Sequence, residues 1–335
     1  MSAGTPEYAI GIDLGGTFIK AGVVDAAGHI IYQASRPTEG EKGRDAIVAN
    51  IAAAAEAVLA GAGFAWEQVA GVGLGSPGVF DYERGGIVHH SPNLKALEGH
   101  PLPLLVQEQL RRPGVPVVLE NDANAAAFAE KWVGAGRDAR SLVLFTLGTG
   151  IGGGIVLDGE VWHGSTGFAG ELGHQTILPE GPLCGCGNRG CLEAIASATG
   201  LVRRLREAVE MGRPTALANR VRGGEKVTSK DVYLAAVAGD ATARALLEET
   251  GRYLGIAAAN MINILNPEMV VFGGGMTGAG EMLLAPIRAE AQRRAIPAAY
   301  AACRIVFAQL GNDAGLIGAA GCVLKASRGS ARARP

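Results

Sequence analysis

Short apolar runs that end at glycine or aspartate recur along the first part of the chain. They occupy residues 8–13, 18–25, 29–35 and 69–81, and a longer Ala-rich segment covers Asp45–Ala60. Apolar runs of about 4–8 residues bounded by glycine turns predict β-strands, whereas a longer segment of Ala, Ile and Val without glycine predicts a helix. The predicted order is therefore strand, strand, strand, helix, strand.

A similar order of elements returns in the middle of the chain. Residues 141–150, 152–159 and 160–164 predict three strands separated by glycine turns. Asp13–Thr17 aligns with Thr146–Gly150, and Ala21–Val24 aligns with Gly153–Val156 after a one-residue shift between the two pairs of segments. We therefore expect a duplicated unit whose two copies place their glycine turns at one interdomain cleft, where ligands usually bind.

Further segments extend this pattern toward the C-terminus. Residues 115–119 predict a strand that leads into an Ala-rich helix at 125–132. A helix within 251–265 ends at an Asn-Pro pair, because proline does not continue a helix, and a strand follows at 269–276. Residues 328–335 lie at the chain end and are predicted to be disordered.

Length and composition fit a globular protein of two lobes. The chain has 335 residues, which is long for one hydrophobic core, and it is 48% hydrophobic and 19% charged. We expect an N-terminal α/β lobe of residues 1–120, completed by a C-terminal helix around 313–326. The larger α/β lobe is expected to span residues 121–312.

The charge balance narrows the range of partners. A formal net charge of −2 and a pI near 6.3 leave no surplus of basic residues to neutralise a phosphate backbone. Nucleic acid is therefore not an expected partner. The N-terminal residues show neither the pattern of a signal peptide nor an apolar stretch of spanning length, so we expect a cytoplasmic protein without membrane association.

Three glycine-rich turns are candidates for binding a nucleotide. Their residues are Asp13, Gly15, Gly16 and Thr17, then Gly148, Thr149 and Gly150, and finally Gly274 and Gly275. Glycine lets backbone amides approach phosphate oxygens, and a carboxylate at a strand end can hold the cation, usually through water. Each turn alone could be an ordinary connection between strands. Together they follow the order of an actin-like ATPase, and neither a P-loop nor a dinucleotide-binding glycine pattern is present.

A polar cluster follows the strand at 115–119 and opens the next helix. It reads Glu120-Asn121-Asp122-Ala123-Asn124. Asn and Asp are preferred helix N-caps, which would explain any one of these residues. Four polar groups exceed what a cap requires, and phosphoryl transfer to a hydroxyl needs a carboxylate that accepts the proton. Asp122, at a strand end, is the candidate for that base.

One histidine and three cysteines lie close together in a glycine-rich stretch. They are His174, Cys184, Cys186 and Cys191. This set matches a Cys₃His zinc site, and four protein ligands leave no open position, so a structural zinc ion is predicted. The alternative of three incidental thiols must explain their occurrence within eight residues. The two remaining cysteines, Cys303 and Cys322, are predicted to be core thiols.

Four segments give the chain a resemblance to a known family. DLGGT, ENDANAAA, the stretch from LGTGIGGGIV to GELGH, and CGCGNRGCLE resemble the ROK family of sugar kinases and repressors, over about Ile10 to Leu316. The resemblance implies an actin-like ATPase fold (a duplicated ribonuclease H-like unit), MgATP as phosphoryl donor and Asp122 as the base. It also implies that a hexose is held by Gly78, Asn121, Asp122, Glu171, His174 and Glu193. One ring nitrogen of His174 would then bind zinc while the other reaches the sugar.

The resemblance leaves several functions open. No helix-turn-helix precedes DLGGT, which favours a kinase over a repressor, and the cysteine cluster favours ATP over polyphosphate as donor. We expect a glucokinase that phosphorylates the 6-hydroxyl of glucose. The alternatives are a kinase of fructose, mannose, allose or an N-acetylated amino sugar, and a sugar sensor without catalysis. A homodimer or homotetramer is expected.

Overall fold

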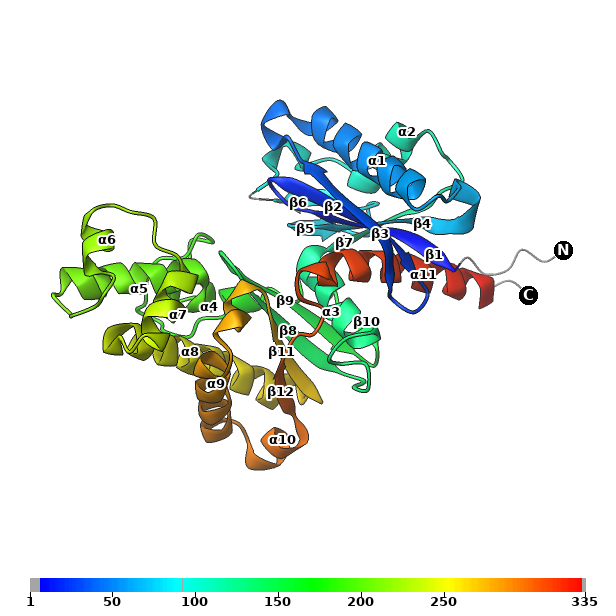
Figure 1. Ribbon diagram of the computed structural model, residues 1–335. Helices are drawn as coiled ribbons and strands as arrows, with labels where there is room; N and C mark the ends of the chain where they lie inside the picture. Colours follow the sequence, from blue (N-terminus) through cyan, green and yellow to red (C-terminus); the bar gives the residue numbers. More distant parts are fainter. Residues whose placement is uncertain (1–6, 92, 333–335) are drawn as a thin grey trace. The chain divides into compact units, whose positions relative to one another are not determined.

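The computed structural model describes residues 7–91 and 93–332, and the chain divides into two compact units (Figure 1). The first unit comprises residues 1–138, 154–170 and 310–335, and the second comprises residues 139–153 and 171–309. The first unit thus extends past the predicted boundary at residue 120. The reason is that the helix after this point packs on the C-terminal helix of the first unit.

The first unit is built on a five-stranded sheet of order β3-β2-β1-β4-β7. Its strands are β1 (Tyr8–Leu14), β2 (Phe18–Asp25), β3 (Ile30–Pro37), β4 (Val69–Ser76) and β7 (Val117–Asn121). Strands β1, β2 and β3 are antiparallel neighbours, whereas β1, β4 and β7 run parallel. The carboxyl ends of the three parallel strands therefore meet at one edge of the sheet.

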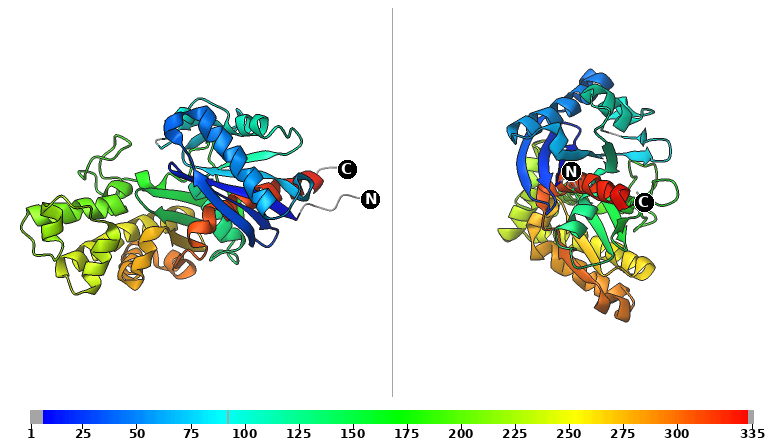
Figure 2. Two further views of the ribbon diagram at one scale, coloured as in Figure 1. Left: turned by 45° about the horizontal axis from the view of Figure 1, so that its top comes forward. Right: turned by 90° about the vertical axis from the view of Figure 1, so that its right-hand side faces the viewer.

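Helices cover both faces of this sheet (Figure 2). Helix α1 (Arg44–Gly61) packs on β2 and β3 with α2 (Leu102–Leu110) beside it, and α11 (Ala314–Arg332) packs on β1 and β4 with α3 (Asp122–Trp132) beside it. Glycines in the strands permit this close packing, because a Cβ on Gly73 would lie 1.9 Å from the carbonyl oxygen of Ala319 in α11. The buried core between α1 and the sheet includes Ile10, Ile51 and Val58.

Short elements complete the first unit. They are η1 (Gly40–Lys42), η2 (Trp66–Gln68), β5 (Val79–Asp81), β6 (Ile87–His90), η3 (Lys95–Leu97) and η6 (Gly311–Asp313). Strands β5 and β6 form an antiparallel hairpin of their own.

A second five-stranded sheet has the order β10-β9-β8-β11-β12. Its strands are β8 (Leu142–Leu147), β9 (Ile151–Leu157), β10 (Glu160–Val161), β11 (Met269–Gly273) and β12 (Arg304–Phe307). Strands β8, β11 and β12 are parallel and lie in the second unit. The strand order repeats that of the first sheet, which confirms the predicted duplication.

The second unit carries additional helices, which are green to orange in Figure 1. They are η4 (Leu172–His174), α4 (Leu192–Ala196), α5 (Ala198–Glu210), α6 (Ala218–Arg222), α7 (Ser229–Val237), α8 (Ala241–Leu265), η5 (Gly275–Ala279), α9 (Glu281–Arg294) and α10 (Pro297–Ala302). Helix α8 contacts α4, α5, α7 and α9. Its backbone approaches α9 closely, since a Cβ on Gly255 would lie 2.6 Å from the carbonyl oxygen of Ile287.

Two expectations about element ends are corrected. The C-terminal residues 328–332, predicted to be disordered, belong to α11, since they contain no proline that would end the helix; residues 333–335 lie outside the described chain. Helix α8 begins at Ala241 rather than near residue 251, with Asp240 as its N-cap. Among the described residues no helix has the length and apolar character needed to cross a membrane.

Candidate active site

Two carboxylates stand at the edge of the first sheet where its parallel strands end. Asp13 lies in β1, and Asp122 directly follows β7 as the first residue of α3. Burial raises the pKa of Asp13 to about 6, with a further contribution from the nearby charge of Asp122, and Lys20 opposes the shift. Burial also raises the pKa of Asp122, although the amide of Ala123 donates to its Oδ1 at 2.8 Å. Both groups therefore hold a proton more tightly than an exposed aspartate.

Asn121, and not Asp122, is the N-cap of α3. Its Oδ1 accepts hydrogen bonds from the amides of Ala123 at 2.9 Å and Asn124 at 3.1 Å. Its Nδ2 donates to the carbonyl of Gly78 at 2.9 Å. Gly78 has φ of 131°, and a Cβ there would lie 2.5 Å from the carbonyl oxygen of His90. Asn121 thus caps α3, and the amide of Ala123 is shared between its Oδ1 and Oδ1 of Asp122, while Oδ2 of Asp122 takes no part in the cap.

The first glycine turn connects β1 and β2 and is held from inside the protein. The amide of Gly15 donates to the carbonyl of Phe18 at 3.0 Å, and the hydroxyl of Thr38 donates to the carbonyl of Gly15 at 2.7 Å. The amide of Thr38 donates to the carbonyl of Thr17 at 2.9 Å. Gly16 and Thr17 themselves are exposed. The turn therefore presents backbone at the surface beside Asp13, as a phosphate site requires.

A buried cluster that the sequence did not reveal lies at the same strand end. Glu120 accepts hydrogen bonds from Tyr82, Asn121, Asn124 and His163. Glu120 belongs to the polar cluster of residues 120–124 that was recognised in the sequence, but its partners Tyr82 and His163 come from segments distant in sequence. No local pattern marks Tyr82 or His163.

The second glycine turn connects β8 and β9 in the second unit. The amide of Ala198 donates to the carbonyl of Gly148 at 3.0 Å, and the hydroxyl of Thr199 donates to the carbonyl of Thr149 at 2.8 Å. The amide of Ile151 donates to Oε2 of Glu193 at 2.9 Å. The start of α4 and the α4–α5 junction thus hold the turn by hydrogen bonds to Gly148, Thr149 and Ile151.

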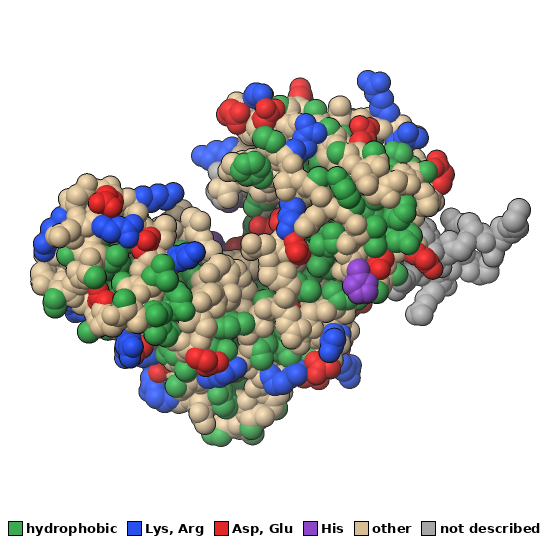
Figure 3. Space-filling view, in the orientation of Figure 1, with side chains coloured by type: hydrophobic (Ala, Val, Ile, Leu, Met, Phe, Trp, Pro, Cys, Tyr) green, Lys and Arg blue, Asp and Glu red, His purple; other side chains and the backbone are tan. Residues whose placement is uncertain are grey.

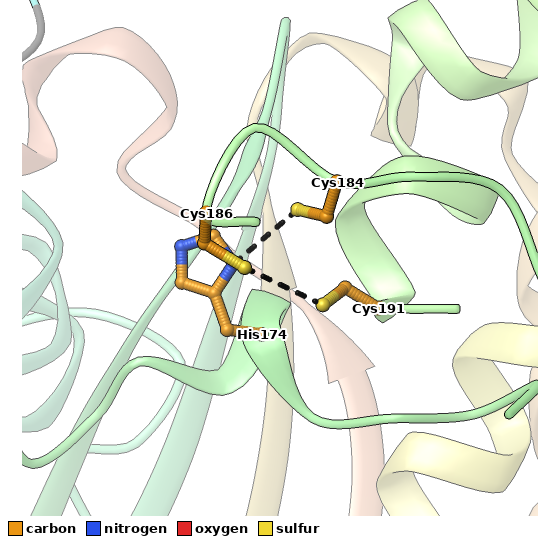
Figure 4. Close-up of side chains that lie close together, drawn as sticks. All are labelled: His174, Cys184, Cys186 and Cys191. Carbon is orange, nitrogen blue, oxygen red and sulfur yellow. Dashed lines mark hydrogen bonds between the residues drawn. The ribbon is translucent and has the colours of Figure 1, made fainter. Parts of the chain in front are cut away.

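The predicted zinc ligands converge in the second unit (Figure 4). Their ligand atoms all lie within 4.8 Å of one another, and two pairs, His174 Nδ1 with Cys184 Sγ and Cys186 Sγ with Cys191 Sγ, are each 3.7 Å apart. A tetrahedral zinc ion with Zn–S bonds of about 2.3 Å places its ligand atoms about 3.8 Å apart. The residues present therefore fit a structural zinc ion.

Three residues predicted to bind sugar lie in or beside this cluster: His174 belongs to it, and Glu171 and Glu193 are its neighbours. Nδ1 of His174 faces Cys184, and its Nε2 lies 3.8 Å from Oε2 of Glu171. Oε1 of Glu193 lies 3.8 Å from Sγ of Cys184, while its Oε2 accepts from the second glycine turn. Glu193 therefore contacts both the cysteine cluster and the phosphate-type turn. That second contact was not predicted.

A cavity of about 290 Å³ opens beyond β11 in the second unit. It is lined by Leu201, Ser229, Lys230, Tyr233, Leu247, Gly275, Met276, Gly278 and Ala279. Gly275 was predicted to contact nucleotide, and Gly274 before it has φ of 90°. An apolar cavity with few polar groups suits a flat heterocyclic ring. The helices that supply most of this lining were not predicted.

The predicted site residues thus form two groups, one in each unit. The first group is Asp13, Gly15, Gly16, Thr17, Gly78, Asn121 and Asp122, and the second is Gly148, Thr149, Gly150, Glu171, His174, Cys184, Cys186, Cys191, Glu193, Gly274 and Gly275. Basic and acidic side chains are interspersed on the visible face of both units (Figure 3).

Two sheets of the same strand order, each with a glycine turn after its first strand, define the actin-like ATPase fold. The chain belongs to the ROK family, whose sequence profile matches residues 9–326. A glucokinase of Halalkalibacterium halodurans is 41% identical over 313 residues, covering 93% of each chain.

Solved structures agree with this assignment. The ROK hexokinase of Thermus thermophilus is similar with a TM-score of 0.80 and 36% identity, over 96% of this chain and 99% of that one. A ROK family glucokinase from Streptomyces griseus, solved in complex with glucose and AMPPNP, has a TM-score of 0.76 and 35% identity, over 94% and 98% of the two chains.

Proposed function

We propose that the protein is an ATP-dependent glucokinase that transfers the γ-phosphoryl group of MgATP to the 6-hydroxyl of glucose. The observation that carries the proposal is Asp122, a carboxylate of raised pKa at the end of a parallel strand and beside Asp13, whose Oδ2 takes no part in the cap of α3. The identity of 41% to a glucokinase supports glucose as the acceptor.

Asp122 supplies the base in this proposal. Its carboxylate accepts the proton of the 6-hydroxyl as the oxygen bonds to phosphorus, and its raised pKa brings it closer to the operating pH, where a general base works best. Bound MgATP supplies the phosphoryl group and a cation that neutralises the charge developing on its oxygens. Asp13 is the carboxylate of this chain that would hold the cation, usually through water.

The glycine turns and the cavity supply the nucleotide contacts. Backbone amides of the two turns are proposed to contact the phosphates, since glycine lets the backbone approach them closely. The amides of Gly15 and Gly148 already donate to Phe18 and Gly150, so these contacts fall to the other amides of the turns. The cavity beside Gly275 and Tyr233 is proposed to hold the adenine ring.

The sugar contacts are proposed from polar side chains of each unit. Asn121 has one N–H of its amide left after its bonds to Gly78 and α3. Glu171 and Nε2 of His174 lie together on the outer side of the cysteine cluster. Carboxylate, amide and imidazole groups bind vicinal hydroxyls of many sugars, so these contacts favour a hexose rather than glucose alone.

The cysteine cluster is proposed to hold one structural zinc ion. Its four ligands close the coordination sphere, and Nδ1 of His174 is the ring nitrogen that faces the thiols. The ion would fix the orientation of His174 and of the neighbouring Glu193. We also propose a homodimer or homotetramer, which sedimentation velocity would reveal as two or four times the chain mass of 34.2 kDa.

A coupled ADP-release assay tests the proposed function. Glucose, fructose, mannose, allose and N-acetylated amino sugars would be offered as acceptors, with ATP or polyphosphate as donor. The proposal predicts the highest kcat/KM for glucose with ATP. A higher value for another hexose would change the acceptor. With polyphosphate as donor no ADP is released, so sugar phosphate is measured instead, and its formation from polyphosphate alone would change the donor. Sugar binding without formation of any sugar phosphate would establish a sensor instead.

A further inference from the structure

Glu120 is a buried carboxylate whose two oxygens are both fully engaged. It is the penultimate residue of β7 and is 6% exposed. Its Oε1 accepts from the hydroxyl of Tyr82 at 3.0 Å, from Nδ2 of Asn124 at 3.1 Å and from the amide of Asn121 at 2.9 Å. Its Oε2 lies 2.8 Å from Nε2 of His163. Four donors thus surround one carboxylate inside the first unit.

Such a carboxylate is costly to bury unless a positive charge and hydrogen bonds compensate it. The hydrogen bond to Glu120 raises the pKa of His163 more than burial lowers it, which favours the charged imidazolium as the partner of the carboxylate. Burial and the charge of Glu120 raise the pKa of Tyr82, so its hydroxyl stays a donor. The nearby Cys322 thiol is kept neutral, because burial raises its pKa.

Glu120 holds the start of α3 at two points. The amide of Asn121 donates to it at the last residue of β7, and Asn124 donates to it from the first turn of the helix. Oδ1 of Asn124 is buried without a partner among the described residues. A carboxylate can only accept, so Glu120 fixes the orientation of that amide. Asp122 lies between these two points.

The two outer donors come from separate segments. Tyr82 lies in the turn between β5 and β6, and His163 lies shortly after β10. Their rings contact each other with centroids 4.8 Å apart. We propose that Tyr82 and His163 are positioning residues for phosphoryl transfer, which act through Glu120 to fix the junction of β7 and α3 that carries Asp122. This inference rests on the proposed function for its catalytic consequence, but not for its geometry.

Steady-state kinetics with glucose and ATP test the catalytic consequence. Because a small displacement of a reacting group can cost about a hundredfold in rate, we expect His163→Ala to lower kcat about ten- to a hundredfold with the KM for ATP unchanged. His163→Gln keeps a donor for Glu120 and should recover much of the loss. Tyr82→Phe should lower kcat as well, and the double variant should lose less than the product of the single losses.

The matched control is His29→Ala, which removes another histidine–carboxylate pair of the first unit, the exposed contact of His29 with Asp25 at 3.1 Å. Its kcat should equal that of the wild type. If His163→Ala lowers the melting temperature but leaves kcat unchanged below that temperature, His163 is only structural and the inference is wrong.

Hydrogen–deuterium exchange tests the geometry without any turnover. Exchange in a peptide covering residues 119–126 should be faster in His163→Ala than in the wild type, and unchanged in His29→Ala. Equal exchange in the wild type and His163→Ala would overturn the inference. If the wild type phosphorylates no hexose, the proposed function fails, and this exchange measurement still decides whether His163 orders the junction.

Discussion

Asn121 and Asp122 are neighbours with different roles, and the proposed chemistry depends on this difference: Asn121 is the N-cap of α3, and Asp122 is the proposed base. Asn121 caps α3 and bonds to Gly78, whereas Asp122 shares the amide of Ala123 through its Oδ1 and its Oδ2 takes no part in the cap. The sequence alone could not separate the two roles, because Asn and Asp are both good caps. The backbone angles of Asn121 and its contact with Gly78 identify Asn121 as the N-cap of α3.

Asp122→Asn should keep sugar binding and lower kcat by about 10²–10⁴, because an amide still hydrogen-bonds a hydroxyl but accepts no proton. The measurement is kcat by ADP release together with glucose binding by calorimetry. Asp25→Asn is the matched control, since Asp25 ends β2 in the same unit and binds only His29 and the local turn. An Asp122→Asn variant with more than about a tenth of the wild-type rate would remove Asp122 from the base role.

Asp13 should make the protein less stable as the pH rises. Its folded pKa of about 6 exceeds the ordinary value of 3.8, so the folded state binds the proton more tightly. Its contribution to the free energy of unfolding is therefore greatest below pH 3.8 and falls as the pH rises through about 6, by at most about 3 kcal/mol. Asp13→Asn should remove this loss.

Thermal unfolding without nucleotide or metal, measured from pH 4 to pH 8, checks this expectation. Asp13→Asn should melt above the wild type at pH 8, and the difference should vanish toward pH 4. Lys20 keeps Asp313 as its partner in the variant. A variant less stable than the wild type at pH 8 would contradict the burial argument.

At the level of elements, the start of α4 and the α4–α5 junction control the second glycine turn. Thr199 and Glu193 contact the turn directly, and Glu193 also contacts the cysteine cluster. The sequence predicted the turn and the cluster separately. It could not predict their connection, because α4 and α5 were not recognised and their contacts with the turn are not local in sequence.

Thr199→Val should raise the KM for ATP about two- to tenfold, since it removes one hydrogen bond to the carbonyl of Thr149 without changing the shape of the side chain. Initial rates at varied ATP and saturating glucose give this value. Thr242→Val is the control, because Thr242 makes the same kind of bond to the carbonyl of Pro214. Equal KM values for the wild type and Thr199→Val would show that this bond does not order the turn.

Cys186→Ser should lose the zinc ion and weaken binding of both substrates, since the cluster orients His174 and contacts Glu193. Native mass spectrometry should find one zinc ion per wild-type chain. Cys303→Ser is the control for the loss of a thiol in the same unit outside the cluster. Fully active wild-type protein that contains no metal would refute the structural zinc ion.

At the scale of the whole molecule, the duplication was predictable and the limits of the units were not. Glycine turns and apolar runs repeat locally, and these repeats located most strands of both sheets. The return of α11 to the first sheet depends on contacts such as that of Gly73 with Ala319, so contacts between distant residues set the limits of the units. Helix α11 covers Ala314–Arg332, where a C-terminal helix was expected around residues 313–326, and the first unit includes residues up to 138.

The central claim is that this chain moves a phosphoryl group from ATP to the 6-hydroxyl of glucose with Asp122 as the base. Phosphorus NMR of a reaction with glucose and ATP tests it most directly, because the coupling of the product phosphorus to sugar protons identifies the esterified carbon. We expect glucose 6-phosphate and ADP as the products of the wild type, and neither from Asp122→Asn over the same time. Formation of inorganic phosphate or of a sugar phosphate esterified elsewhere, or an undiminished yield from Asp122→Asn, would contradict it.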